Sequence, residues 1–450
     1  MSKHNLTQGS VPGALARLTA PMVMGVSSSI LVQTLEMGFI GQLSTRHVAA
    51  ITFTFPVTMI LTSIALGISI GVSSVIARSV GAGLSGDVRS LATHGVILVA
   101  LVSIALSIVA WMSMDAIFLS LGAEASMLPL IHSYLDIYLP GTVLFTVTMI
   151  LGSIMRANGN ANIPGVVMTL GALGNLALDP ILIFGWFGLP RMELAGAATA
   201  MTLTRVVTAG VMLYFVLKGQ LFLTERLLHG FVASARRILH VGVPAMATQL
   251  IGPVSNVIIT RMLAEYGEVV VAGYGVASRI EAVAAMLMFA LSGSIGPFVG
   301  QNWGASQSAR VSAGVRVSYQ FCLAWGLAIA ALLYLAGATV AGWLEPSTEV
   351  IQVAAIYLLI VPWSYGFWGV LMMASASFNA LGKPLPGTVL SFTRMLVVYV
   401  PLAITLNHLF GYTGIFIATL ASNILMGIAG YLWFRSQLNS MIVTQGRSPA

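Results

Sequence analysis

The feature that most constrains this chain is a series of twelve long apolar stretches. Each has about 20–30 residues, enough for an α-helix to cross the ~30 Å hydrocarbon core of a bilayer. Because lipid offers no partners to backbone N–H and C=O groups, such stretches must be helical. We therefore predict an all-α integral membrane protein with twelve transmembrane helices. The predicted spans are 14–40, 48–77, 91–118, 128–155, 163–187, 193–217, 239–263, 269–299, 311–341, 350–378, 387–409 and 412–435.

Composition supports this class and excludes others. Only 7% of the 450 residues are charged, against roughly 25% in soluble domains. The net charge of +7 is spread over many loops, without the basic run and interleaved aromatic residues of a nucleic-acid interface. Cys322 is the single cysteine, which excludes an intramolecular disulfide and a cysteine metal site. We expect the lipid bilayer as a partner and no nucleic acid.

The chain divides into two similar halves. The longest polar segment, 218–240, is a predicted cytoplasmic linker between an N-terminal six-helix bundle, 1–217, and a C-terminal one, 241–450. A constant shift of 223 residues superimposes three well-separated marks, which indicates duplication. These marks are Pro21 on Pro244, Gly81 on Gly304 and Gly159 on Gly382. Since each half has an even number of helices, the two bundles are predicted to be related by a pseudo-two-fold axis along the membrane normal.

The positive-inside rule predicts the orientation. With the N-terminus in the cytoplasm, the loops assigned to the outside hold only Arg46, Arg191 and Arg261, and the other loop and terminal Lys and Arg residues lie inside. Basic residues concentrate on the cytoplasmic side of membrane proteins. Both termini are therefore predicted to be cytoplasmic.

The stretch 171–185, GALGNLALDPILIFG, carries polar residues at membrane depth. A carboxylate there costs at least ~2.5–3.5 kcal/mol on insertion scales, so it needs a partner or a water-filled cavity. Asn175 and Asp179 are four residues apart and share one helix face. Pro180 has no N–H to donate and leaves the carbonyl of Leu176 free beside them. Such oxygen atoms are the ligands of a hard cation or of a transferred proton.

A second acid, Glu36, is predicted to lie at a similar depth. At ~1.5 Å per residue, Glu36 lies ~30 Å and Asp179 ~24 Å above the inner ends of their helices. We therefore predict a shared site. The alternative is that an arginine such as Arg205 or Arg394 neutralises each acid, but intramembrane carboxylates are more often functional. The 223-residue shift places this site in the first half only, because the matching positions are Ile259, Val398 and Leu402.

Two further features are interpreted from the residues alone. Arg279 and Glu281 form a candidate gating pair near a helix end. No HExxH, GxxxxGK[ST] or GxSxG motif occurs, so neither an enzyme nor ATP-driven transport is predicted. Transport would then be driven by an ion gradient.

The chain resembles the multidrug and toxic compound extrusion (MATE) family of secondary transporters over its whole length. The motifs that carry the resemblance include LEMGFIGQL at 35–43, NLALDPILIFG at 175–185, VAGYGVASRIE at 271–281 and FVGQNWGAS at 298–306. The RIE at 279–281, with the acidic site confined to the first half, is similar to the DNA-damage-inducible F (DinF) branch.

The resemblance implies a drug:cation antiporter in the bacterial cytoplasmic (inner) membrane. Its two six-helix bundles would form a V and alternate between outward-open and inward-open states. The family's first-helix aspartate corresponds to Glu36, and its fifth-helix Asn and Asp correspond to Asn175 and Asp179. Its sixth-helix threonine falls at Met201. The candidate cation or substrate contacts are Thr199, Thr202 and Gln33.

We therefore predict proton-coupled efflux of small-molecule drugs and organic cations by a monomer without a cofactor. Glu36 and Asp179 would load protons, Asn175 would hold the carboxylates, and Pro180 would couple protonation to helix bending. Na⁺ is the alternative coupling ion, bound by Glu36, Asn175 and Asp179. The alternative functions are a flippase for lipid-linked oligosaccharide or lipid, and a non-transporting membrane scaffold or sensor.

Overall fold

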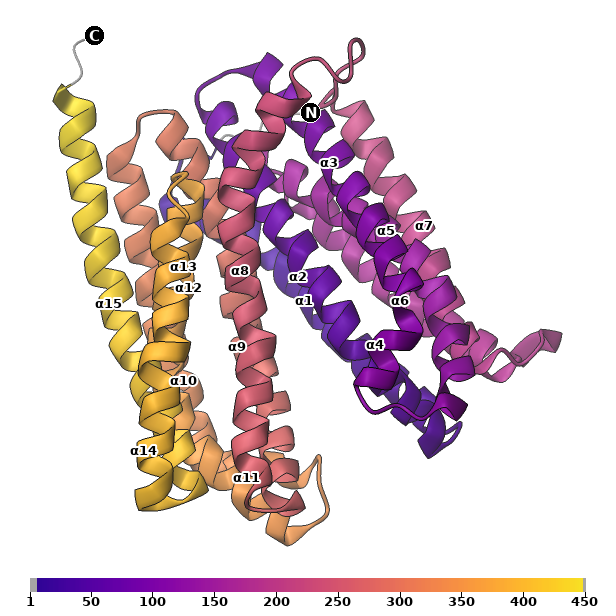
Figure 1. Ribbon diagram of the computed structural model, residues 1–450. Helices are drawn as coiled ribbons and strands as arrows, with labels where there is room; N and C mark the ends of the chain where they lie inside the picture. The colour runs from indigo at the N-terminus through magenta and orange to yellow at the C-terminus, as the bar shows by residue number, and fades with distance from the viewer. Residues whose placement is uncertain (1–5, 448–450) are drawn as a thin grey trace. The chain divides into compact units, whose positions relative to one another are not determined.

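The structure, a computed structural model, describes residues 6–447 as helices joined by turns (Figure 1). Within this range twelve helices are long and apolar enough to cross a membrane. The predicted all-α membrane fold is thus confirmed. The helices are α1 Val11–Gly41, α2 Thr45–Gly81, α3 Ser85–Met112, α4 Met114–Ser120, η1 Ala125–Met127, α5 Leu128–Ala157, α6 Asn162–Phe184, η2 Trp186–Gly188, α7 Glu193–Lys218, α8 Phe231–Ala264, α9 Glu268–Gly304, α10 Ser308–Gly342, α11 Thr348–Ile360, η3 Val361–Ser364, α12 Tyr365–Ala380, α13 Leu385–Phe392, η4 Thr393–Tyr399, α14 Val400–Phe410 and α15 Tyr412–Arg447.

Two of the spans are assembled from shorter helical pieces. The tenth consists of α11, the 3₁₀ turn η3 and α12, and the eleventh consists of α13, the π-helical segment η4 and α14. Pro362 lies in η3, and Pro401 follows η4. Because proline cannot donate to the carbonyl of the preceding turn, regular α-helical hydrogen bonding is interrupted near these positions.

The helix ends differ most from the predicted ones at the starts of α3 and α8 and at the end of α15, which continues to Arg447 instead of ending at 435. The third span was expected to start at 91 and the seventh at 239, whereas α3 begins at Ser85 and α8 at Phe231. The additional turn of α3 carries Asp87, and that of α8 carries Arg237. Hydropathy detects only the apolar part of a helix, so turns that continue beyond it in polar sequence are missed.

The predicted linker, 218–240, is therefore partly helical, and it is attached to α3. The Leu227 carbonyl oxygen lies 3.0 Å from Nε2 of His94, which is fully buried. Arg237 donates two hydrogen bonds to the carboxylate of Asp87, at 2.7 and 3.0 Å. These contacts fix the segment 218–240 against α3.

The described chain divides into two compact units. Unit 1 comprises Ala20–Met246, and unit 2 comprises Leu6–Thr19 together with Ala247 onward. Both divisions fall inside helices, α1 and α8, within three residues of Pro21 and Pro244. The first turns of each of these helices thus belong to one unit and the remainder to the other. Residues 1–5 and 448–450, included in the predicted ranges 1–217 and 241–450, lie outside the described part.

Small residues set the distance between several neighbouring helices. A methyl group added to Gly326 in α10 would lie 2.2 Å from the backbone nitrogen of Gly366, and one added to Gly196 would lie 2.5 Å from the Leu182 carbonyl oxygen. In lipid, helices associate through close packing rather than through the hydrophobic effect. Glycine at these positions therefore permits the contact on which each unit depends.

We predict that Gly326→Ala lowers the free energy of unfolding by about 1–3 kcal/mol, because overpacking forces α10 and α12 apart. Gly275→Ala in α9 is the matched control, since nothing lies within 4 Å of the added methyl group. Thermal melting of both purified variants in detergent checks this. Equal melting temperatures would contradict the packing role of Gly326.

Candidate functional site

Glu36 lies on the buried face of α1. Its side chain is 7% exposed, and Ile40, one helical turn later, is fully buried in an apolar cluster of unit 1. Ile183 of α6 belongs to the same cluster and stands one turn after Asp179. Because residues four apart share a helix face, this packing turns Glu36 and Asp179 toward the interior of the same bundle.

Asn175 and Asp179 form a direct contact within α6. Asn175 Nδ2 donates to Asp179 Oδ2 at 2.9 Å, and the two residues are 6% and 0% exposed. Asp179 also lies within electrostatic range of Glu36. The structure thus brings together the three residues predicted for the acidic site, from two helices that are far apart in the sequence.

Three oxygen atoms of this acidic site have no hydrogen-bond partner. They are Oε1 of Glu36, Oδ1 of Asn175 and Oδ1 of Asp179, all buried. More than about nine in ten buried polar groups in proteins are hydrogen-bonded. Three unpartnered acceptors on neighbouring residues form an oxygen-rich site that a proton or a small hard cation would satisfy.

Arg205 of α7 does not neutralise these acids by direct pairing. It lies within electrostatic range of Glu36, but among the described residues it forms no ion pair with either carboxylate. Its guanidinium carbon instead stands 4.6 Å from the ring centre of Tyr138 and 5.1 Å from that of Phe145. The buried Nη1 atom has no hydrogen-bond partner. The site therefore combines two carboxyl groups with a cation held against aromatic rings.

The other predicted contact residues are engaged elsewhere. Thr199 donates to the carbonyl of Ala195 in its own helix at 2.7 Å, and Thr202 donates to the Ile137 carbonyl of α5 at 3.3 Å. The side chain of Gln33 is exposed. No hydrogen bond between described residues links these three side chains to the acidic site, so their role as contacts stays a prediction.

Pro180 lies inside α6, and the helix continues through it to Phe184. The helix ends at Gly185, whose φ of 75° is left-handed and suits glycine. A proline in a continuous helix removes one backbone hydrogen bond next to Asp179. Helix bending at this position stays a prediction.

Arg279 and Glu281 form no ion pair in the part of the chain that the structure describes, and a gating role for these residues stays a prediction. The two residues are two apart on α9, where side chains do not face each other, and Arg279 is exposed. The carboxylate of Glu281 accepts hydrogen bonds from Tyr357 at 2.6 Å and Tyr365 at 3.1 Å. Glu281 is thus held by hydroxyl groups of the tenth span.

Glu281 also belongs to a larger polar network of unit 2. It lies within electrostatic range of Arg394, whose Nη1 donates to Asn423 at 2.9 Å. Asn423 Nδ2 in turn donates to Ser364 at 3.0 Å. Sequence reasoning identified Glu281 and Arg394 as intramembrane charges but missed their partners. The sequence places Tyr357 and Tyr365 in one predicted span, but their spacing alone does not indicate that both hydroxyl groups bind the same carboxylate.

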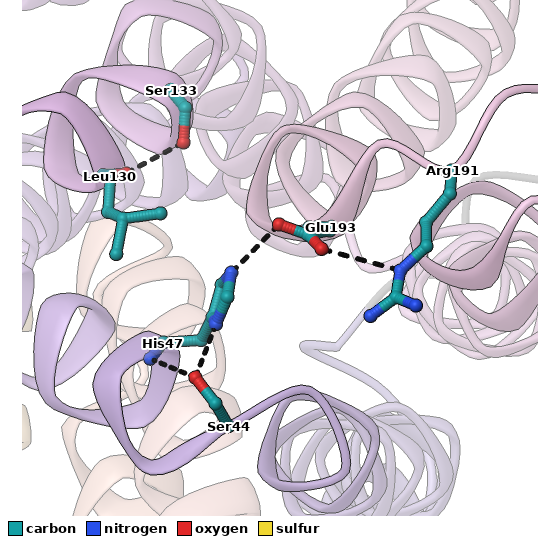
Figure 2. Close-up of polar contacts among 6 residues, drawn as sticks. All are labelled: Ser44, His47, Leu130, Ser133, Arg191 and Glu193. Carbon is teal, nitrogen blue, oxygen red and sulfur yellow. Dashed lines mark hydrogen bonds and ion pairs between the residues drawn. The ribbon is translucent and has the colours of Figure 1, made fainter.

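A polar cluster stands at the end of unit 1 nearest the acidic site. His47 Nδ1 lies 2.7 Å from the hydroxyl of Ser44, which caps the start of α2, and Nε2 lies 2.9 Å from Glu193 at the start of α7 (Figure 2). Arg191 binds the other oxygen of Glu193 at 3.3 Å. Figure 2 also shows Ser133 bonded to Leu130 in the neighbouring α5. This cluster ties the starts of α2 and α7 together.

A bundle of apolar helices with buried, unpartnered carboxyl oxygens defines a polytopic membrane transporter rather than an enzyme. The family model described as MatE matches residues 21–181 and 244–405. The two matched segments begin at Pro21 and Pro244, the marks that define the internal repeat. The chain belongs to the MATE family of membrane transporters.

Individual relatives are similar along nearly the whole chain. The FAD transporter of Shewanella oneidensis is 31% identical over 431 residues, which cover 95% of each chain. A probable multidrug resistance protein NorM of Thermotoga maritima is 24% identical over 96% of this chain and 95% of its own. The crystal structure of the Vibrio cholerae MATE transporter VcmN in its bent form superimposes with a TM-score of 0.91 at 30% identity, covering 96% and 97% of the chains.

The hydrogen bond between Asn175 and Asp179 yields a first test. We predict that Asn175→Ala lowers the free energy of unfolding by about 1–3 kcal/mol, because it leaves a second buried carboxylate oxygen unpartnered. In an Asp179→Ala background the same change should have a much smaller effect. A double-mutant cycle of melting temperatures in detergent measures the coupling, and additive effects would contradict it.

The position of Arg394 yields a second test. We predict that Arg394→Met destabilises unit 2 by about 1–3 kcal/mol, because it leaves the partly buried Glu281 without its neighbouring cation and Asn423 without its donor. The matched change Arg279→Met, at an exposed side chain, should stay within about 0.5 kcal/mol. Chemical or thermal unfolding of the two variants compares them, and equal effects would contradict the role of Arg394 beside Glu281.

Proposed function

We propose that this transporter exports apolar and cationic small molecules in exchange for protons, by alternating access. The observation that supports this most strongly is the buried cluster of Glu36, Asn175 and Asp179 with its three unpartnered oxygen atoms. Membership of the MATE family and the multidrug resistance relative support the class of substrate.

The coupling rests on the charge of the two carboxyl groups. When Glu36 and Asp179 are ionised, two like charges lie close together in a low-dielectric interior, so a bound organic cation or a proton is stabilised there. Protons that enter from outside would neutralise the carboxylates, remove the attraction for a cationic substrate and favour its release. Asn175, bonded to Asp179, holds that carboxylate in place while the other oxygen takes up the proton.

Helix α6 would transmit the change in protonation. Pro180 follows Asp179 directly and removes a backbone hydrogen bond from that turn. A helix weakened at this point bends at lower energy than a regular one. A switch of this kind needs a local change of charge and an element with two arrangements, and we infer that Asp179 would supply the first and Pro180 the second.

Sodium is the alternative coupling ion. Carboxylate and amide oxygens are suitable ligands for a hard cation, and Glu36, Asn175 and Asp179 each carry one buried oxygen without a partner. Na⁺ would then take the place of the proton as the transported ion. The rest of the proposed transport cycle would be the same with either ion.

A second candidate substrate class is an anionic flavin nucleotide. The Shewanella oneidensis relative is named an FAD transporter and is 31% identical to this chain. Arg205 supports this class, because its Nη1 is unpartnered and its guanidinium lies against two aromatic rings. A cation beside aromatic surfaces suits a ligand that is both aromatic and negatively charged. The relatives described here lend no support to the flippase alternative.

We further propose a bacterial cytoplasmic-membrane location with both termini in the cytoplasm, and a monomeric state. The distribution of Lys and Arg among the loops supports this orientation through the positive-inside rule. Nothing in the site calls for a residue from a second copy, since Glu36, Asn175 and Asp179 all belong to unit 1.

The proton-coupled function predicts a defined response to substitution. In vesicles that contain the purified protein, a pH gradient alone should drive dye efflux, and a Na⁺ gradient alone should not. Glu36→Gln and Asp179→Asn should each reduce proton-driven transport by at least roughly tenfold, because each removes a titrating carboxyl group.

Asp136→Asn is the matched control. Asp136 is a half-exposed carboxylate of the same unit, which contacts Trp111 and His132 rather than the acidic site. Transport by this variant should match the wild type. Unchanged efflux by both Glu36→Gln and Asp179→Asn would overturn the mechanism, and efflux driven by Na⁺ alone would replace the proton with sodium.

Transport assays in the same vesicles distinguish the two candidate substrate classes, flavin nucleotides and organic cations. If the flavin nucleotide class is correct, FAD should be transported and Arg205→Met should abolish its transport. If the organic cation class is correct, FAD should not compete with the dye. Flavin fluorescence inside the vesicles reports the first outcome, and dye efflux in excess FAD reports the second.

A further inference from the structure

Unit 2 contains a groove whose lining includes no residue of the acidic site or of the Glu281 network. It lies between α10, α12 and α15, which are neighbours in the bundle (Figure 1), and it has a volume of about 680 Å³. Its walls combine basic, amide and hydroxyl groups with apolar side chains, and none of the lining residues is acidic. The groove is thus a concave surface with a positive charge.

The basic residues lie at one end of the groove. Arg316 projects from the early turns of α10, and Arg435 projects from the later turns of α15; both are exposed. Among the described residues neither forms an ion pair, and Arg435 makes only a long contact of 3.5 Å with the hydroxyl of Tyr431. Gln320 and Asn439 add amide groups at this end. Two cations without counter-charges indicate an anionic ligand.

One residue that lines the groove also carries a buried hydroxyl group. Tyr319 lines it, yet its side chain is only 6% exposed and its hydroxyl has no hydrogen-bond partner. The ring is fixed by an edge-on contact with Tyr431, with centroids 5.7 Å apart. A buried hydroxyl without a partner is unfavourable, so an oxygen atom of a bound molecule would satisfy it.

The opposite end of the groove is apolar. Leu323, about three turns further along α10 than Ser312, lines this end together with Phe367 and Val370 of α12 and Ile428 of α15. Behind them Gly427 lets α15 approach α12, since an added methyl group would lie 2.5 Å from the Phe367 carbonyl oxygen. The lining therefore changes from basic to apolar along the direction of the helices, which is the direction of the membrane normal.

We propose that this groove binds an anionic phospholipid. Arg316 and Arg435 would hold the phosphate and the anionic headgroup, Tyr319 would donate to a glycerol or phosphate oxygen, and the acyl chains would lie along Leu323, Phe367 and Ile428. The expected orientation places Arg316 and Arg435 on the cytoplasmic side, and basic pockets between helices on this side bind anionic headgroups. A free anion would use the basic end alone and leave the apolar wall uncovered.

The test compares lipid retention by full-length protein. Wild type, Arg316→Gln/Arg435→Gln, Tyr319→Phe and the control Arg17→Gln/Lys383→Gln are purified in detergent with an equimolar mixture of phosphatidylglycerol and phosphatidylcholine. Native mass spectrometry then counts the lipid that stays bound. The control removes two exposed cations of the same unit that do not line the groove.

We expect wild type and control to retain phosphatidylglycerol in preference to phosphatidylcholine. The double arginine variant should retain roughly tenfold less of it, because two cationic contacts at the membrane surface are lost. Tyr319→Phe should retain less lipid while its melting temperature without lipid does not fall, which separates ligand binding from folding. Phosphatidylglycerol should also raise the melting temperature of wild type more than of the double arginine variant.

Three results would overturn the proposal. The first is equal retention of the two lipids by wild type, and the second is equal retention of phosphatidylglycerol by wild type and the double arginine variant. The third is that excess inorganic phosphate stabilises the protein as well as phosphatidylglycerol does, which would identify a simple anion site. If the groove instead serves exported molecules, the double arginine variant would lose dye binding in lipid-free detergent, and this too would count against a lipid.

Discussion

Lipid cannot satisfy a hydrogen bond, and every polar group in the spans of this protein is subject to that constraint. Many serine and threonine hydroxyl groups donate a hydrogen bond to a backbone carbonyl of their own helix, as Thr169 does to Gly165 and Ser318 does to Gly314. Such local bonds make a hydroxyl compatible with a membrane at little energetic expense. The unpartnered oxygens of Glu36 and Asp179 depart from this pattern, and they do so together. Two neighbouring buried acids with unpartnered oxygens are therefore a stronger indication of a functional site than one buried acid would be.

The two halves of the chain share a fold but have different polar interiors. In unit 2, both tyrosine hydroxyls donate to the Glu281 carboxylate and Arg394 lies in electrostatic range. In unit 1, Asp179 has one amide donor and one free oxygen. Hydrogen-bond donors offset part of the energetic penalty of burying a carboxylate, so the acid of unit 2 is more fully satisfied by protein groups than the acids of unit 1. The two halves of the duplicated scaffold thus surround their acids with different numbers of hydrogen-bond donors.

Much of this organisation could be predicted from the sequence, for identifiable reasons. Spans follow from apolar length, and the depth of Glu36 and Asp179 follows from the constant rise of a helix. The partners of Glu281 could not be found in this way, because they depend on how α9 is rotated against the tenth span. The sequence neighbour Arg279 was chosen instead, although residues two apart on a helix diverge. Hydropathy does not detect the early start of α8, because Arg236 and Arg237 interrupt the apolar pattern soon after the helix begins.

The assignment of Leu6–Thr19 to unit 2 affects the order in which the protein can be made. Leu6 is bonded to Gln301 and Asn302, which are 295 and 296 residues later in the chain, and Arg310 binds the carbonyl oxygens of Leu6 and Gly9. At roughly 5–20 residues per second, a ribosome needs about 15–60 seconds to deliver these partners. Unit 1, by contrast, is complete once Met246 has been synthesised. Leu6–Thr19 leaves the ribosome well before its partners and is therefore among the last parts of the described chain to reach its final contacts, and during that interval the membrane and its insertion machinery must accommodate it without them.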